Sequence, residues 1–396
     1  MWDAVIIGAR CAGASAALLL ARRGQRVLLV DRAIFPSDVM STLYIHQPGI
    51  ALLDRWGLLD SIAASGCPRL DTLSYHVQDI ELHGPVAAYG DVTATYAPRR
   101  KVLDQLLVNA AVAAGAEFAE GLSLSSMLWE DGHVAGVRLR AKDGSEVSER
   151  ASLVIGADGM RSRLAELAGA GYVIEDPSAT CVYYTGWTGM SCGLQTRLRP
   201  GGAIATVPTN DGVTLVLTYF PQNSFRSIKM NPLKAHLGCL SAVAPDLFEQ
   251  LSSGEQAVKL QGTGDQRNFF RKAHGPGWVL IGDAGLHLDS ITALGIANAF
   301  EQADLLDAAL GDDLADRQRV AAALSSFESQ ARNMLSEGYQ RTLEATNLQV
   351  PAARLRMLRE ISQVPALTER YFAVVAGLIS FDDFLTPELA GAFENK

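Results

Sequence analysis

Short, fully apolar runs and helix-forming segments alternate at the start of the chain. The run Asp3–Ile7 predicts a buried strand, and Val27–Val30 predicts a second one. Between them, Gly13–Arg23 is rich in Ala and Leu and predicts a helix, which Gly24 ends as a C-cap. A strand, a helix and a strand at this close spacing form a βαβ unit, which is typical of a parallel, doubly wound sheet.

The same kinds of segment return later in the chain. Arg100–Ala114 carries Leu and Ala on one face and predicts a helix. Asp131-Gly132 and Asp143-Gly144 separate three alternating segments, and both dipeptides are strong signals for β-hairpins. Two further buried strands are expected at Leu153–Ile155 and Trp278–Ile281. The strands of one sheet are therefore expected to come from distant parts of the chain.

Residues 176–272 differ in character, because runs rich in Val, Thr and Tyr alternate there with turns. We expect them to form a separate antiparallel sheet that residues 73–96 complete. From Ile296 onward almost every segment has helical composition. These patterns predict an α/β fold with a Rossmann-like nucleotide-binding domain, an inserted antiparallel β-sheet substrate domain and C-terminal helices. The predicted division is 1–72, 97–175 and 273–312 for the nucleotide-binding domain, 73–96 and 176–272 for the substrate domain, and 313–396 for the C-terminal helical region.

Composition narrows the class of protein. The chain carries 34 basic and 43 acidic residues, and this net charge of −9 argues against a nucleic acid partner. Its five cysteines contain no CxxC pair, so we expect neither disulfides nor a zinc site, but a reducing compartment. No apolar run is long enough to cross a membrane, and the chain opens on a strand instead of a signal peptide. A soluble, cytoplasmic protein is the expectation.

The turn after the first predicted strand is a candidate phosphate-binding loop. In Gly8-Ala9-Arg10-Cys11-Ala12-Gly13, Gly8 permits a tight turn and Gly13 lets the helix pack closely on the strand. The helix N-terminus then presents free N–H groups and a positive dipole to a pyrophosphate. Arg10 stands where a middle glycine would allow the closest approach, and we expect it to contact the phosphates itself. Asp31, at the end of the second strand, is expected to accept hydrogen bonds from ribose hydroxyls.

Two later strands also lead into a glycine and an acid. Leu153–Ile155 precedes Asp158-Gly159, which we interpret as a second loop in contact with the dinucleotide. Trp278–Ile281 precedes Gly282-Asp283, and an acid there can accept hydrogen bonds from the hydroxyls of a flavin's ribityl chain. The helix that begins near Gly295 points its positive end at the same place, which suits an anionic reduced flavin.

These three motifs, in this order, resemble those of the FAD-dependent aromatic hydroxylases of the p-hydroxybenzoate hydroxylase type, the group A flavin monooxygenases. Geranylgeranyl reductases and flavin-dependent halogenases are relatives of that family. The resemblance covers residues 1–310 and implies a Rossmann-like FAD-binding domain of the GR2 type. It also implies that Arg100 is the family's flavin-binding arginine and that Leu124 contacts adenine through its backbone. The segment that begins at Ser41 is expected to line the flavin. The predicted cofactor-binding residues are Gly8, Arg10, Cys11, Ala12, Gly13, Asp31, Arg32, Ser41, Thr42, Arg100, Leu124, Asp158, Gly282, Asp283, Leu294, Gly295 and Ile296.

The chain departs from the family's pattern beside the reactive edge of the flavin. Ser290 replaces a proline, Ala293 a glycine and Ala297 an asparagine. The family's usual histidine position holds Leu286, and Ala165 replaces the arginine that closes the second motif. We expect FAD binding to survive these changes, and we expect the loop at Ser290 to be bulkier and more polar than in the hydroxylases.

The resemblance implies an NAD(P)H-dependent FAD monooxygenase that uses O2 to hydroxylate or epoxidise an apolar small molecule. NADH or NADPH is expected to be a transient reductant, because no separate domain for it is visible. His46 and His287 are candidate catalytic residues by their position in the sequence. No metal site is expected, because the histidines lack metal-ligand spacing.

Two other functions stay open at this point. One is an FAD-dependent reductase that delivers hydride to a substrate double bond, as the geranylgeranyl reductases do. The other is a non-catalytic binding protein with a flavoprotein fold, and the retention of Asp158, Asp283 and Arg100 argues against it. Halogenation is disfavoured, since no lysine precedes Lys101 and the halogenases' Trp-x-Trp-x-Ile-Pro segment is absent. The sequence leaves the substrate and the oligomeric state undetermined.

Overall fold

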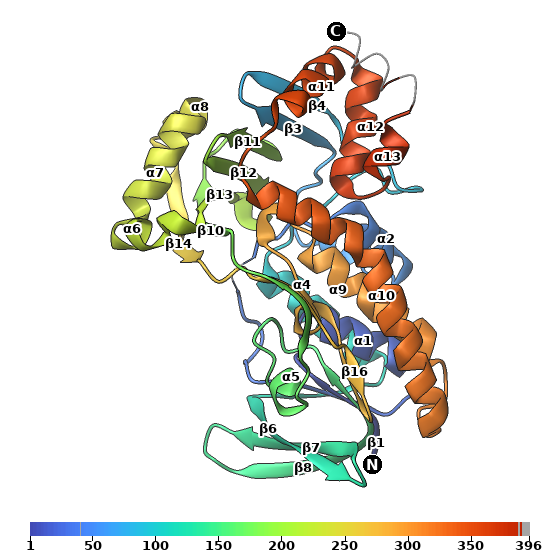
Figure 1. Cartoon of the computed structure of the whole chain (residues 1–396). Helices are drawn as coiled ribbons and strands as arrows, with labels where there is room; N and C mark the ends of the chain where they lie inside the picture. Colours follow the sequence, from blue (N-terminus) through green and yellow to red (C-terminus); the bar gives the residue numbers. More distant parts are fainter. Residues whose placement is uncertain (40, 387–388, 390–396) are drawn as a thin grey trace.

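The structure is a computed structural model that describes residues 1–39, 41–386 and 389. One sheet is mostly parallel and has the strand order β16-β17-β8-β1-β2-β5. Its strands β1, β8 and β16 are labelled in the lower half of Figure 1. Each neighbouring pair in this order is parallel except β16–β17. The strands are β1 Trp2–Ile7, β2 Val27–Asp31, β5 Glu117–Glu120, β8 Glu146–Gly156, β16 His274–Gly275 and β17 Trp278–Leu280. All five residues of β2 are buried, which explains its continuous apolar run.

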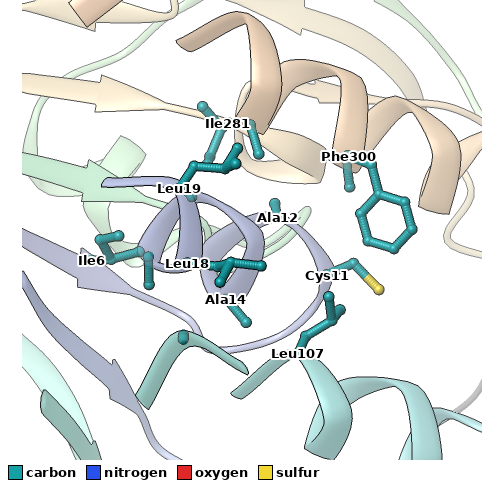
Figure 2. Packing of buried hydrophobic residues seen from close by; sticks show 14 of the residues in the cluster. Ile6, Cys11, Ala12, Ala14, Leu18, Leu19, Leu107, Ile281 and Phe300 are labelled. Atoms are coloured by element: carbon teal, nitrogen blue, oxygen red, sulfur yellow. The ribbon is translucent and has the colours of Figure 1, made fainter. Parts of the chain in front are cut away.

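Helix α1 (Cys11–Arg22) packs between this sheet and two other helices. It contacts α4 (Arg100–Ala113) and α9 (Gly295–Leu310), which come from distant parts of the chain. Figure 2 shows the cluster around α1, in which Ile6 of β1 and Phe300 of α9 are both fully buried. Burying an apolar side chain of this size contributes roughly 1.5–3 kcal/mol. The apolar faces of α4 and α9 therefore hold α1 against the sheet.

Two antiparallel strands extend the sheet away from its parallel centre. β6 (Leu122–Glu130) pairs with β7 (His133–Ala141), and β7 pairs with the first half of β8. Both hairpins expected from the Asp-Gly dipeptides are confirmed. In the first of them, Asp131 and Gly132 have φ of +50° and +75°, the positive values that a tight two-residue hairpin turn requires.

A second sheet of seven strands lies in the order β14-β10-β13-β12-β11-β3-β4. It is antiparallel as predicted, except that β11 and β3 run parallel. The parallel pair arises because β3 and β4 come from an earlier part of the chain, so that no hairpin joins β3 to β11. The strands are β3 Thr72–Val77, β4 Ile80–Pro85, β10 Thr180–Thr188, β11 Gln195–Arg199, β12 Gly202–Pro208, β13 Thr214–Pro221 and β14 Glu255–Thr263.

Three helices that the sequence pattern did not predict cover one face of this sheet. They are α6 (Phe225–Met230), α7 (Pro232–Val243) and α8 (Pro245–Leu251). Leu240 of α7 and Ile204 of β12 are fully buried in the cluster that joins them to the sheet. The opposite face carries a separate apolar cluster, which includes Leu43 and Tyr44 from the segment after β2.

The remaining elements connect these layers. A short third sheet has the strand order β18-β15-β9, and the C-terminal helices α11 and α12 contact β4 (Figure 1). None of the helices among the described residues is both long and apolar enough to cross a membrane. The residue bounds of the three predicted parts stay a prediction. The other elements are α2 Gln47–Arg55, α3 Leu59–Ala64, α5 Arg163–Leu167, β9 Tyr172–Asp176, β15 Asn268–Arg271, β18 Leu286–His287, α10 Arg317–Thr346, α11 Ala352–Ser362, α12 Pro365–Ala376 and α13 Phe381–Phe384.

The contact of α1 with the turn after β1 generates a stability prediction. A Cβ at Gly13 would lie 1.8 Å from the carbonyl oxygen of Gly8. We expect Gly13→Ala to lower the free energy of unfolding by about 1–3 kcal/mol or more, although alanine is the better helix former. Gly171→Ala is the control, because a Cβ there meets nothing within 4 Å. Thermal unfolding measures both, and a wild-type melting temperature for Gly13→Ala would contradict the contact.

Candidate functional site

A cavity of about 820 Å³ lies where the predicted motifs converge. The turn after β1, the ends of β2 and β8, the loop after β17 and the N-terminus of α9 bound it on one side, and β10 bounds it on the other. Most of the residues predicted to bind a cofactor come together here. Those that line the cavity are Gly8, Arg10, Cys11, Ala12, Asp31, Arg32, Ser41, Thr42, Arg100, Leu124, Asp158, Gly282, Asp283, Gly295 and Ile296.

Two glycines let α1 begin directly at this cavity. A Cβ at Gly8 would lie 2.3 Å from the carbonyl oxygen of Ala157, and Gly8 has φ of +104°, which other residues rarely adopt. Gly13 does not line the cavity, but its missing side chain lets α1 touch the backbone of Gly8. No side chain caps the N-terminus of α1, so its first N–H groups are available to a bound anion.

Two arginines share one buried carboxylate beside the start of α1. The Arg10 Nη1 lies 2.7 Å from Asp104 Oδ2, and the Arg100 Nη2 lies 2.9 Å from Asp104 Oδ1. Asp104 is fully buried, so the trio leaves one net positive charge at the cavity wall. The ion pair with Asp104 thus fixes the Arg10 side chain. The contact of Arg10 with phosphates stays a prediction. Burial raises the pKa of Cys11 to about 12, which keeps this thiol protonated and unreactive.

Two predicted acids use their carboxylates to fix the backbone of the site. Asp31 accepts hydrogen bonds from the N–H groups of Ala9 and Ala33, both at 2.8 Å, and so ties the end of β2 to the turn after β1. Asp158 accepts a hydrogen bond from the Ser162 hydroxyl at 2.5 Å and others from backbone N–H groups at the start of α5. Burial raises the pKa of Asp158. Both acids therefore shape the cavity that they line.

Asp283 differs from these acids. It lies in the short 3-10 turn Gly282–Ala284 after β17, and no described residue donates a hydrogen bond to its carboxylate. The N-terminus of α9 opens on the same cavity without a side-chain cap, and Gly295 and Ile296 line it. A free carboxylate and an uncapped helix end at one cavity leave hydrogen-bonding capacity for a bound molecule with hydroxyls and an anionic part.

His46 and Leu294 lie outside the cavity. Leu294 is buried in an apolar cluster with residues of α10. His46 does not line the cavity. Its Nε2 lies 3.0 Å from the carbonyl oxygen of Thr292. Burial lowers the pKa of His46 to about 4, so the ring is neutral at physiological pH and donates this hydrogen bond. His46 therefore positions the loop that carries Thr292.

His287, the other candidate histidine, lines the cavity. Its Nδ1 lies 2.5 Å from the carbonyl oxygen of Arg267, and its ring stacks on Phe269 at a centroid distance of 5.7 Å. The structure thus separates the two histidines that sequence position alone treated alike.

Several residues that line the cavity were missed by the sequence analysis. They come from the seven-stranded sheet and the segment after it, where no motif marks them: Val182, Tyr184, Thr263, Asp265 and Gln266. Only the folding of this sheet over the nucleotide-binding part brings them to the site.

A chain of hydrogen bonds ties the loop after β18 to the seven-stranded sheet. The Ser290 hydroxyl donates to Gln266 Oε1 at 2.6 Å, and Gln266 Nε2 donates to Thr180 Oγ1 at 2.8 Å. Thr180 in turn donates to Asp289 Oδ2 at 2.6 Å, and Tyr219 donates to the carbonyl oxygen of Ser290 at 3.1 Å. The polar groups of this loop therefore hold it against β10 and β13 through hydrogen bonds.

The same loop stores backbone strain at Ala293. This residue has φ of +54°, in the left-handed region that favours glycine. It is the position where the hydroxylase pattern has a glycine, and the side chain lines the cavity. Hydrogen bonds at Ser290 and Thr292, shortly before Ala293 in the chain, hold the loop in place.

Asp289 generates a prediction about pH and stability. Burial raises its pKa to about 6, against 3.8 for an ordinary aspartate. The charged form therefore destabilises the folded protein above pH 6, and this effect vanishes below about pH 4. We expect Asp289→Asn to gain up to about 3 kcal/mol relative to the wild type as pH rises from 4 to 7. Denaturant unfolding at several pH values measures this, with exposed Glu249→Gln as the control. A pH-independent difference between Asp289→Asn and wild type would contradict the prediction.

The cavity fits the cofactor that the motifs imply. It combines a glycine cradle that a Cβ would fill, two uncapped helix N-termini, the cations Arg10 and Arg100, and the free carboxylate of Asp283. These groups match a dinucleotide with a pyrophosphate and a polyhydroxylated chain.

Comparison with known proteins gives related enzymes. A digeranylgeranylglycerophospholipid reductase of Methanothermobacter thermautotrophicus is 26% identical over 359 residues, which span 87% of this chain and 86% of the relative. Among solved structures, the flavin-dependent brominase Bmp2 covers 100% of this chain and 97% of its own, with a TM-score of 0.82 at 18% identity. PqsL, a probable FAD-dependent monooxygenase of Pseudomonas aeruginosa, has a TM-score of 0.70 at 18% identity, covering 94% of this chain and 99% of its own.

At these identities the two structures show the fold alone. A family model described as "FAD binding domain" matches residues 1–337 of the chain. Because this match spans most of the chain, from the glycine turn through the cavity to α10, the protein is a member of the FAD-binding domain family and an FAD-dependent oxidoreductase.

Proposed function

We propose that the protein is an NAD(P)H-dependent FAD monooxygenase that hydroxylates or epoxidises an apolar small molecule. The observation that carries this proposal is the apolar inner face of the substrate sheet, which meets the loop after β18 at the cavity. Val182 and Leu217 of this face are buried in one cluster with Leu43, and Ala293 of the loop packs against it. An oxygenating flavin needs a site from which water is excluded, and this face supplies one.

When bound, FAD supplies the redox chemistry, and the chain binds, orients and shields it. The N-terminus of α1 with Arg10 and Arg100 would hold the pyrophosphate, and Asp283 would hold the ribityl hydroxyls. The N-terminus of α9 would face the ring and stabilise negative charge on it. The substrate sheet would hold the substrate on the other side of the ring.

A second opening supports a pyridine nucleotide as the reductant. A groove of about 930 Å³ lies beside the FAD cavity and shares Arg161, Thr263 and Asp265 with it. Arg267 and Lys229 also line this groove. Arg161 and Arg267 are paired with carboxylates of the same groove, so the Lys229 ammonium would attract a phosphate of NADH or NADPH, while the shared wall would let the nicotinamide reach the flavin.

The second candidate is an FAD-dependent reductase that adds hydride to a substrate double bond. Four of the similar proteins are named digeranylgeranylglycerophospholipid reductases, which favours this reading. Halogenation has less support, although Bmp2 shares the fold, because no lysine is among the described residues that line the cavity.

We propose the cytoplasm as the location of the protein. In support, all five cysteines are unpaired, and three of them are buried. Unpaired and buried cysteine thiols are typical of proteins in a reducing compartment.

Asp283→Ala tests the cofactor site. Losing hydrogen bonds to a charged acceptor costs about 1.5–3 kcal/mol each, so we expect FAD affinity to fall by about tenfold or more and the protein to purify largely colourless. Flavin absorbance per protein measures the loss, and exposed Asp91→Ala serves as the control. Full FAD content in Asp283→Ala would show that the ribityl chain does not lie there.

Oxygen use separates the two candidate functions. The FAD-loaded protein is given deuterium-labelled NADH or NADPH, isotope-labelled O2 and a panel of apolar alkenes and aromatics. A monooxygenase is expected to place one labelled oxygen atom in the product, which mass spectrometry detects. Turnover without O2, with deuterium delivered to carbon, would replace the monooxygenase with the reductase.

A further inference from the structure

The orientation of the His287 ring is fixed by its surroundings. His287 ends β18 and pairs with Phe269 of β15 across the antiparallel ladder. Its ring stacks on the Phe269 ring with an angle of 26° between the planes, and Phe269 is fully buried. The imidazole therefore sits on a rigid support at the cavity wall.

The hydrogen bond of the His287 Nδ1 determines which ring nitrogen can act as a base. A carbonyl oxygen only accepts hydrogen bonds, so the Nδ1 that lies 2.5 Å from the Arg267 carbonyl carries the proton. In the neutral ring, Nε2 then holds the lone pair. No described residue bonds this Nε2. His236 shows the contrast, because Thr185 and Thr218 occupy both of its ring nitrogens.

Charged groups of both signs lie near His287. The buried Asp289 carboxylate interacts electrostatically with the imidazole. Arg267 and Arg161 also lie at this wall, but each is paired with Asp265, at 3.3 Å and 2.8 Å. Arg267 has a further partner in Glu175, at 3.2 Å. Both arginines are therefore paired with carboxylates.

We propose that His287 is the acid–base residue of this site and that its Nε2 accepts the proton of an ionisable O–H on a molecule bound in the cavity. The O–H bond breaks, an N–H bond forms, the electron pair stays on oxygen, and the imidazole becomes imidazolium. The use of this proton transfer in turnover rests on the proposed function. The transfer itself requires neither O2 nor a reductant.

The test uses 4-nitrophenol as the probe, because its phenolate absorbs visible light. The probe is titrated with pH in the presence of excess full-length FAD-loaded protein, and flavin absorbance is subtracted. Beside an imidazolium, the bound phenol is expected to ionise at a pH lower by about one unit than the free phenol. In His287→Asn the amide can replace the Nδ1–H donor to Arg267, but no base remains in place of Nε2, so we expect this shift to disappear.

His133→Asn is the matched control, because the Nδ1 of His133 also lies at a backbone carbonyl, that of Val134 at 2.9 Å, outside the cavity. It is expected to keep the shift, and FAD content shows whether each variant is folded. A shift that survives in His287→Asn, or a wild-type protein that fails to bind or ionise the probe, overturns the proposal. A shift without labelled oxygen in any product would leave His287 as the base and remove only the monooxygenase.

Discussion

The contact between two glycine backbones determines where every other part of the site lies. Because Gly13 has no side chain, α1 rests against the carbonyl oxygen of Gly8 and begins at the edge of the cavity. Helices α4 and α9 both pack on α1, so their positions follow from this contact. α4 carries Arg100, and the N-terminus of α9 lines the cavity. A side chain at Gly13 would therefore displace three elements of the site together.

The acids of the site show how environment assigns different tasks to one residue type. Asp104 is fully buried and neutralised by two arginines. The carboxylate oxygens of Asp31 and Asp158 accept hydrogen bonds from backbone N–H groups, and these bonds hold the loops in place. No described residue donates a hydrogen bond to the Asp283 carboxylate, which lines the cavity and interacts electrostatically with Arg100. Burial with partners fixes structure, whereas a carboxylate without partners at a cavity wall is available for binding.

The substrate side of the cavity is built from a locked loop against an apolar sheet. Ser290, Asp289 and Ala293 are the positions at which the chain departs from the hydroxylase pattern or flanks such a departure, and all three are held by buried hydrogen bonds or by a strained backbone. The departures thus exchange a permissive glycine- and proline-rich loop for a rigid polar one. This rigidity holds the loop against the apolar cluster on the inner face of the sheet.

The sequence by itself determined the local part of this description. The βαβ unit, the glycine turn, the acid at the end of β2 and the two hairpins follow from residues close in the chain, and each appears where its pattern predicts. Helices α6–α8 were missed because their apolar positions pack on the substrate sheet in short stretches that carry weak periodicity. Local patterns report local geometry, so they could not show such packing.

Tertiary structure alone decided which side chains meet at the cavity. Val182 and Gln266 line it although no motif marks them, and the partner of Arg10 is Asp104, a residue 94 positions away. Likewise, sequence position made His46 and His287 equal candidates. In the structure, His46 is bonded to the carbonyl of Thr292 away from the cavity, whereas His287 lines the cavity. The physical reason is that a side chain's environment depends on contacts between segments far apart in the chain, and the residues near it in sequence do not encode them.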